Sequence, residues 1–280
     1  DKDSVEENMG LAYAPENRPT PGISLVLGAG NVASIAPLDV VDKIFLEHQT
    51  CILKMNPVND YLGPLIEEAF DPLVRRNFLR VVYGAGDVGA YLCNHASISS
   101  IHITGSHHTH DAIVWGPPGP EREERKASGN PINTKPITSE LGNVSPVIVV
   151  PGPWTAKDLS TQAVNVVTML GNNGGFNCNA ARVLIQHKSW SLRSSFRDEI
   201  IRTFQSVPNR VAYYPGAEER FDAFIADHPN AQQIGERSNG TLPWGIIPDV
   251  DPDGEDEICF QTEAFCSIFA ETGLEADDPI

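Results

Sequence analysis

The chain has 280 residues, and its 37 acidic and 20 basic side chains give a formal net charge of −17. This charge argues against nucleic acids and anionic membrane surfaces as partners, because both are bound through clustered lysines and arginines. An apolar content of 41% is enough for the core of one large domain or two ordinary ones. Residues 218–278 contain 16 acidic and two basic side chains, a pattern that predicts a hydrated surface.

The five cysteines are dispersed along the chain and show no CxxC spacing. In a chain of this size the pattern does not indicate a disulfide framework, so we expect a reducing, cytoplasmic compartment. The sequence contains no apolar run of the roughly 18 residues that a membrane-spanning helix needs. We therefore expect no membrane partner.

Residues 1–21 are polar and contain several prolines, and we expect them to lead into the first domain. Beyond them, short apolar runs alternate with segments of helical spacing. The apolar runs predict buried strands at 23–27, 51–55, 79–83, 100–104, 145–150 and 182–186. The helical segments are 38–45, 61–78, 88–94 and 156–170, and Pro64 and Pro72 interrupt the second of them. This alternation is typical of an α/β protein with a largely parallel sheet, and residues 116–135, rich in Pro, Gly and charge, indicate an exposed insertion.

Two glycine-rich turns follow predicted strands. Gly28-Ala-Gly-Asn-Val-Ala33 fits GxGxxG/A, and Gly84-Ala-Gly-Asp-Val-Gly89 fits GxGxxG. Glycines at this spacing let backbone amides approach a pyrophosphate at the start of a helix. A dinucleotide fold normally carries one such turn, with an acidic residue about 20 positions later. The nearest acid after the first turn is Glu47, which lies ahead of the second strand, so a standard nucleotide grip stays open for both turns.

Two further patterns raise the question of a metal site. His102, His107, His108 and His110 are close in sequence, but no cysteine or carboxylate stands at a ligand spacing from them. Residues 249–254 begin like an EF-hand loop, yet position twelve is Phe260 instead of Glu. The sequence therefore predicts no metal ligand, and residues 249–254 are interpreted as an acidic turn.

Five short regions, in this order, resemble the aldehyde dehydrogenase superfamily. They are LGAGNVAS with Asn31, ILKMNP with Lys54, ITGS at 103–106, the pair SELGNVSP and NNGGFNCNAAR with Glu140 and Cys178, and TEAF with Glu263 and Phe265. The ELGxxSP stretch is the most specific, and the resemblance extends from about residue 22 to the C-terminus. It implies a Rossmann-type cofactor-binding domain in residues 1–140, including the lead-in, and an α/β catalytic domain in residues 141–280.

The resemblance implies oxidation of an aldehyde through a covalent cysteine intermediate. Cys178 matches the nucleophile, and a thiolate suits this role because it attacks readily and leaves well. Asn31 matches a donor to the oxyanion, together with the Cys178 backbone N–H. Glu140 matches the general base that activates water to cleave the thioester. Alone, each residue also has an ordinary structural interpretation: an inert cysteine, a turn asparagine and an acid at the end of a strand or helix.

The resemblance also assigns residues to an NAD or NADP cofactor. Lys54 matches the lysine that hydrogen-bonds the adenosine ribose, and Gly84 becomes a turn on the adenine side. Thr104, Gly105 and Ser106 match the segment that faces the pyrophosphate from the start of a helix. Glu263 and Phe265 match the residues that hold the nicotinamide ribose and the nicotinamide ring.

The chain departs from the family pattern at three places. Pro57 stands where the family usually has a ribose-binding Glu, which leaves NAD against NADP open. The histidines that follow Ser106 replace an expected glycine. The cysteine loop is one residue shorter toward Arg182, so an ungapped alignment puts Asn177 at the nucleophile position; Cys178 is preferred because an amide has no comparable chemistry.

Two other functions stay open. The segment at 30–32 also resembles fatty acyl-CoA reductases, so the same fold could reduce an acyl-CoA or acyl phosphate to an aldehyde. A non-catalytic protein that keeps the fold is the other alternative. Because family members are considerably longer, we expect residues 1–280 to be an internal fragment whose catalytic domain is truncated, and the full-length protein to be a homo-oligomer acting on a small aldehyde.

Overall fold

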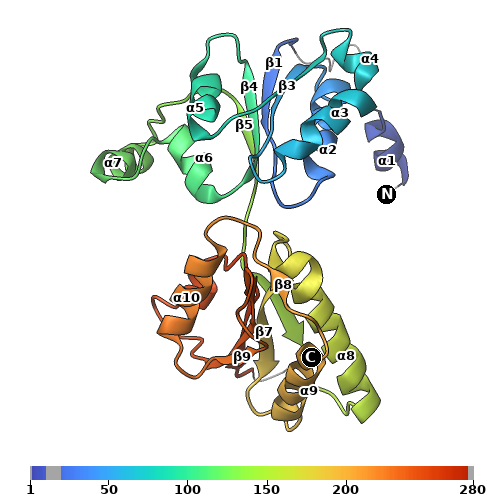
Figure 1. The fold of residues 1–280 in the computed structure, drawn as a ribbon, viewed down its shortest axis with the longest axis vertical. Helices are drawn as coiled ribbons and strands as arrows, with labels where there is room; N and C mark the ends of the chain where they lie inside the picture. Colours follow the sequence, from blue (N-terminus) through green and yellow to red (C-terminus); the bar gives the residue numbers. More distant parts are fainter. Residues whose placement is uncertain (1, 11–19, 277–280) are drawn as a thin grey trace. The chain divides into compact units, whose positions relative to one another are not determined.

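The structure is a computed structural model that describes residues 2–10 and 20–276, and Figure 1 shows its ribbon. The chain divides into two compact units, residues 1–141 and residues 142–280. Within the lead-in, residues 2–8 form helix α1 (Lys2–Asn8), while residues 1 and 11–19 lie outside the described part. Each unit is an α/β layer structure, which confirms the predicted fold class.

The first unit is built on a parallel sheet with the strand order β3-β2-β1-β4-β5. Its strands are β1 (Ile23–Leu27), β2 (Thr50–Lys54), β3 (Leu79–Val82), β4 (Ser100–Gly105) and β5 (Ile137–Leu141). The chain adds β2 and β3 on one side of β1 and then crosses to add β4 and β5 on the other. Ligands of such sheets bind beyond the carboxyl ends of the strands, where the order reverses.

Helices cover both faces of this sheet, because neighbouring side chains of β1 point to opposite sides. Val26 packs in a cluster with Val40 of α2 (Ile35–Phe45), whereas Leu25 packs with Cys93 of α5 (Gly86–Asn94). The remaining helices of this unit are η3 (Asp60–Leu62), α3 (Gly63–Ala69), α4 (Asp71–Val74), α6 (His107–Val114) and α7 (Pro120–Ser128).

Three details of this unit add to the sequence-based expectation. The segment 61–78 is divided into short helices because Pro64 and Pro72 each occupy the first turn of a new helix. Residues 116–135 are exposed but not irregular, since they contain helix α7 between Gly119 and the left-handed Gly129. Strand β5 was not predicted, because its middle residues are polar and exposed, as suits the edge of a sheet.

The second unit has a largely parallel sheet with the order β6-β7-β12-β11-β9, in which β9 is antiparallel. Its strands are β6 (Ser145–Val149), β7 (Ala181–His187), β9 (Gln232–Ile234), β11 (Trp244–Val250) and β12 (Ile268–Leu274); β8 (Arg210–Val211) pairs with β10 (Thr241–Leu242). The helices are α8 (Ala156–Gly171), η4 (Asn172–Gly175), α9 (Arg193–Gln205), α10 (Ala217–Asp227) and α11 (Ile258–Gln261). One core lies under α8 and α9 and the other under α10 (Figure 1).

The acidic stretch of residues 218–278 is only partly a hydrated surface, which corrects the expectation from charge. Glu271 on β12 is fully buried, and its carboxylate accepts hydrogen bonds from Arg193 Nε at 2.7 Å and Gln186 Nε2 at 3.1 Å. Arg197 Nη1 lies 3.4 Å from the other carboxylate oxygen, and the Asp249 backbone N–H donates to that oxygen. A buried carboxylate needs such partners, because isolated charge is costly inside a protein.

All five cysteines lie in the described part of the chain and are free thiols. Among the described residues, no helix is both long and apolar enough to cross a membrane.

Substitution of Glu271 tests the buried network. Glu271→Gln keeps the shape but removes the charge that faces Arg193, so we expect the free energy of unfolding to fall by roughly 2 kcal/mol, the scale of a hydrogen bond to a charged group. Asp249→Asn, at the exposed end of the same network, is the control and should cost less than about 1 kcal/mol. Denaturant unfolding measures both, and equal losses would contradict the central place of Glu271.

Candidate functional site

The predicted cofactor residues of the first unit lie at the carboxyl ends of its strands. Lys54 is the last residue of β2, Gly84 follows β3, and Thr104 and Gly105 end β4. The loop after β1 carries Asn31. Because all these strands are parallel, their carboxyl ends lie on the same side of the sheet, where this class of sheet binds ligands. On the edge strand β5, Glu140 is exposed and pairs with Thr104.

Lys54 is not an ordinary surface lysine. Its side chain is buried, with 8% of its area exposed, at the end of the β2 strand. Burial lowers the pKa of Lys54, and the nearby Asp87 in the first turn of α5 acts in the opposite direction. A partly desolvated ammonium beside the sheet edge is well suited to donate hydrogen bonds to a polar ligand.

Ser106 is the N-cap of α6. Its Oγ accepts a hydrogen bond from the Thr109 backbone N–H at 3.2 Å, so the helix begins at the end of β4. The first amides of the helix and its dipole favour an anion there. His107 and His108 occupy the first turn with ring centroids 3.8 Å apart, and burial, followed by the charge of His108, lowers the pKa of His107.

In the second unit, the site segments lie at the amino ends of three adjacent strands. Asn143 precedes β6, Cys178 precedes β7, and Glu263 and Phe265 precede β12. These strands are neighbours in the order β6-β7-β12 and all run parallel. The sheet therefore brings together segments that are far apart in the sequence.

Cys178 is exposed in the loop between η4 and β7. Asn143 Nδ2 donates to the Cys178 carbonyl at 2.9 Å and so fixes the backbone on which the thiol stands. The preceding Asn177 uses its side-chain oxygen to accept from Asn173 Nδ2 at 3.2 Å. The side-chain oxygen of Asn177 is thus hydrogen-bonded inside the loop, whereas the Cys178 side chain is accessible.

Arg182 ties the cysteine loop to Cys266, the residue that directly follows the Glu263–Phe265 segment (residues 263–265). The arginine is buried on β7 and donates from Nη1 to the Cys266 carbonyl at 2.9 Å and from Nη2 to the Gly175 carbonyl. Gly175 is in the left-handed region (φ 84°), and a Cβ there would lie 2.3 Å from the Cys266 carbonyl oxygen. Only glycine allows these two backbones to approach so closely.

Glu263 is a half-buried carboxyl whose environment is built by the ELG motif. A Cβ on Gly142 would lie 1.8 Å from Glu263 Oε2, so the glycine makes room for this carboxylate. Burial raises the pKa of Glu263, while the charge of Arg182 and the Asn143 backbone N–H lower it again. Glu263 Oε1 is buried and has no hydrogen-bond partner among the described residues. An acceptor in this state is suited to a hydroxyl or amide donor from a ligand.

The Phe265 ring is held from several sides. It packs edge-on against Tyr214 and Phe176, with centroid distances of 4.9 and 5.6 Å. The Arg220 guanidinium lies 6.0 Å from the ring centroid and donates to the carbonyls of Ala264 and Phe265. Phe265 itself has a positive φ of 40°, which aims its side chain differently from an extended residue.

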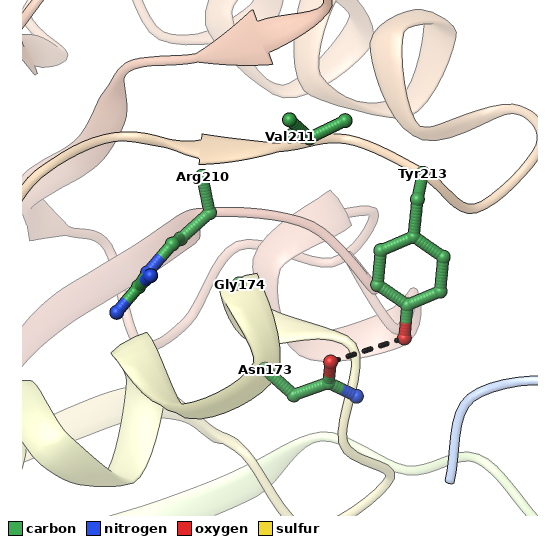
Figure 2. Close-up of a pocket in the computed structure, with 5 residues that line it drawn as sticks. All are labelled: Asn173, Gly174, Arg210, Val211 and Tyr213. Carbon is green, nitrogen blue, oxygen red and sulfur yellow. Dashed lines mark hydrogen bonds between the residues drawn. The ribbon is translucent and has the colours of Figure 1, made fainter. Parts of the chain in front are cut away.

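A pocket of about 370 Å³ adjoins the cysteine loop (Figure 2). Its lining comes from η4 and from the strand β8 with the residues after it: Asn173, Gly174, Arg210, Val211 and Tyr213. Tyr213 Oη donates to Asn173 Oδ1 at 3.2 Å across the pocket wall (Figure 2). Asn173 is left-handed (φ 52°), as is common for asparagine in tight turns.

Several residues of this region could not be assigned a role from the sequence. Arg182 and Asn143 were noticed as parts of motifs, but nothing in their spacing shows that they bond backbone carbonyls of distant loops. Tyr213 and Arg210 lie in a segment to which no function was assigned. The Asn-Gly pair at 173–174 was the available signal, because it marks a tight turn beside the pocket.

A family model for the aldehyde dehydrogenase family matches residues 48–211. The 4-trimethylaminobutyraldehyde dehydrogenases of Rattus norvegicus and Homo sapiens are 28% and 26% identical over 160 and 159 residues, which is 56% of this chain and 28% of each relative. The matched stretch thus spans little more than a quarter of these curated relatives.

Solved structures show the same fold. An aldehyde dehydrogenase from Mycobacterium tuberculosis complexed with NAD+ superposes with a TM-score of 0.72 at 19% identity, covering 92% of this chain and 53% of that one. An NADP-dependent glyceraldehyde-3-phosphate dehydrogenase from Bacillus halodurans C-125 complexed with NADP gives 0.71 at 18% identity, covering 92% and 52%. The chain therefore spans about half the length of these structures.

The buried carboxyl of Glu263 predicts a pH dependence. Well below its ordinary pKa of 4.5 the carboxyl is protonated in the folded and unfolded states alike. As the pH rises through the higher folded pKa, ionisation is harder in the folded state, so wild type should lose stability relative to Glu263→Gln. Denaturant unfolding of both proteins at a series of pH values measures this difference.

Asp158 provides a control of opposite sign. Its hydrogen bonds with Thr155 at the start of α8 lower the pKa of Asp158. Wild type should therefore gain stability relative to Asp158→Asn as the pH rises and lose it as the pH falls through the folded pKa. If Glu263→Gln shifted stability equally at every pH, the raised pKa of Glu263 would be wrong.

Proposed function

Because this chain belongs to the aldehyde dehydrogenase family, we propose that it serves the NAD(P)-dependent oxidation of an aldehyde to a carboxylic acid through a cysteine thioester. The observation that carries the proposal is the second unit's site: an exposed Cys178 on a loop that buried Arg182 joins to the segment of Glu263. A reactive thiol has to be accessible and held in place, and this loop meets both conditions.

The residues present fit a nicotinamide dinucleotide. Glu263 Oε1 is a buried acceptor with no partner among the described residues, and a ribose hydroxyl would satisfy it. The α6 N-terminus at Ser106 suits a pyrophosphate, and the partly buried Lys54 suits a ribose. When bound, the oxidised cofactor supplies the acceptor for the hydride that the aldehyde loses. The relatives in complex with NAD+ and with NADP support testing both cofactors.

In the proposed reaction, Cys178 Sγ loses its proton to solvent and forms a bond to the aldehyde carbon, while the electron pair of the C=O π bond moves to the carbonyl oxygen. The Cys178 backbone N–H and the Asn31 side chain are the proposed donors to the developing oxyanion. Once the aldehyde hydrogen has left with its electron pair, the sulfur holds the acyl group as a thioester. Glu140 is the proposed base that takes a proton from water, whose oxygen then bonds the acyl carbon and releases the acid and the thiol.

Removal of the nucleophile is the direct test. In Cys178→Ala no sulfur can bond the aldehyde carbon, so we expect kcat/KM for NAD(P)H formation to fall at least about a thousandfold. The assay follows NAD(P)H absorbance with a panel of aldehydes. The panel includes 4-trimethylaminobutyraldehyde, because the curated relatives carry its name. Cys51→Ala, a buried thiol of the first sheet, is the matched control and should keep its activity. A wild type that neither reduces nor binds NAD(P) would support a non-catalytic protein instead.

Glu140→Gln separates thioester formation from its hydrolysis. We expect the first turnover to produce NAD(P)H as in wild type, while steady-state turnover falls roughly a hundredfold or more, because the base acts after oxidation. Rapid mixing with wild type and variant measures burst and steady rate. A lost burst would contradict the assigned role. A wild type that turns over only when coenzyme A is added would favour an acyl-CoA reductase working toward the aldehyde.

A further inference from the structure

A cluster of side chains of the kind that bind metal ions lies in the second unit and includes no residue of the proposed aldehyde site. His228 follows the last turn of α10, Glu257 is the N-cap of α11, and Cys259 is on α11. The ligand atoms of these three residues all lie within 4.8 Å of one another. His228 Nε2 is 3.2 Å from Glu257 Oε1 and 3.9 Å from Cys259 Sγ.

The orientation of His228 leaves Nε2 pointing at a carboxylate. Its other nitrogen, Nδ1, lies 2.9 Å from the Phe224 carbonyl oxygen, which can only accept, so Nδ1 carries a proton. In the neutral ring Nε2 is then an acceptor, and it faces both oxygens of Glu257 at 3.2 and 3.3 Å. Two acceptors this close require a proton or a cation between them. A backbone carbonyl behind the ring is also how proteins orient metal-binding histidines.

The two separations that involve His228 suit one small ion, and the third pair, Glu257 and Cys259, lies within 4.8 Å. Tetrahedral zinc at about 2.0–2.3 Å from N, O and S ligands separates those ligand atoms by roughly 3.3–3.6 Å. The observed His228–Glu257 separation of 3.2 Å and His228–Cys259 separation of 3.9 Å lie on either side of that range. Imidazole and thiol ligands favour zinc over calcium or magnesium, which prefer all-oxygen sites.

The surrounding charge also favours a cation. Burial raises the pKa of the Cys259 thiol, and the negative charges of Glu257 and Asp227 act in the same direction. Residues 218–278 hold 16 acidic but only two basic side chains. Both bases are engaged elsewhere: Arg220 bonds the carbonyls of Ala264 and Phe265, and Arg237 pairs with Asp222. The side chains of His228 and Glu257 remain 12% and 15% exposed, so an ion can reach them from solvent.

We propose that His228 Nε2, Glu257 and Cys259 Sγ bind one zinc ion, with the fourth position left to water. Binding exchanges the Cys259 thiol proton, which goes to solvent, for the metal bond. The ion would join the end of α10 to the start of α11, a few residues before Glu263. This site lies outside the proposed aldehyde chemistry and stands or falls separately from it.

The test uses the 280-residue chain carrying Cys178→Ser, because the exposed thiol would also take up soft metals. After removal of metal with a chelator, the protein is titrated with Co²⁺ and with Zn²⁺. We expect one equivalent of Co²⁺ to produce a thiolate-to-cobalt charge-transfer band and tetrahedral visible bands, which Zn²⁺ then abolishes. Equilibrium dialysis with metal analysis should find one zinc per chain, and zinc should raise the unfolding temperature.

The ligand variants decide the assignment. Cys259→Ser should remove the charge-transfer band, and His228→Gln and Glu257→Gln should each lower zinc affinity at least about tenfold. Glu257→Gln keeps an oxygen for the Cys259 backbone N–H, which now donates to Glu257 at 2.8 Å, so this variant retains the helix cap. Cys51→Ser and His95→Gln are matched controls and should bind zinc as the parent does.

Circular dichroism in the presence of chelator shows which variants fold; if Cys259→Ser does not, the other two decide. The proposal is overturned if the parent takes up no stoichiometric zinc or if the cobalt band survives in Cys259→Ser. It is equally overturned if zinc leaves the unfolding temperature unchanged, in which case the cluster is a His–Glu ion pair.

Discussion

The second unit's site depends on the hydrogen bonds that the buried guanidinium of Arg182 donates to two loops. A cation inside a protein needs acceptors around it. Arg182 donates from its two Nη atoms to the carbonyls of Cys266 and Gly175 and lies near the charge of Glu263, whereas its Nε has no partner among the described residues. One side chain on β7 therefore holds two loops at once. The cysteine loop and the Glu263–Phe265 segment owe their mutual position to it.

Two glycines make this arrangement possible. Gly175 allows its backbone to approach Cys266, and Gly142 leaves the space that the Glu263 carboxylate occupies. The glycines of the ELG and NNGG sequences thus leave the space that the half-buried Glu263 carboxylate and the Cys266 backbone occupy. The same packing keeps water from Glu263, which is why burial dominates the pKa of this carboxyl.

The acidic residues of the chain lie in different environments. Glu271 is buried against Arg193 and Arg197, and Glu257 faces His228, although both belong to the stretch that composition alone assigns to a hydrated surface. Other acids of the stretch, such as Asp251 and Asp253, are exposed in the turn after β11. Charge counts predict the average environment of a region, whereas the environment of each acid depends on which strand or cap it occupies.

The sequence by itself determined the fold class, the family, four of the five strands of the first sheet and two of the five of the second, β6 and β7. The spacing of apolar residues and the residues that end each apolar run are local properties, so ISLVL and CILKM could be assigned to buried strands. The order of the motifs identified the family. The sequence did not reveal the exposed edge strand β5 or helix α7, because their residues bury little and leave a weak pattern. The strands β9, β11 and β12 of the second sheet were not predicted either.

Only the tertiary structure decided which side chains meet. The amino ends of β6, β7 and β12 bring Asn143, Cys178 and Glu263 into one region because the sheet orders these strands as neighbours. Likewise, His228 reaches Glu257 and Cys259 through the packing of α10 near α11, across an interval that no ligand-spacing rule covers. Contacts between distant segments are set by strand order and core packing, and neither is encoded at any single position of the sequence.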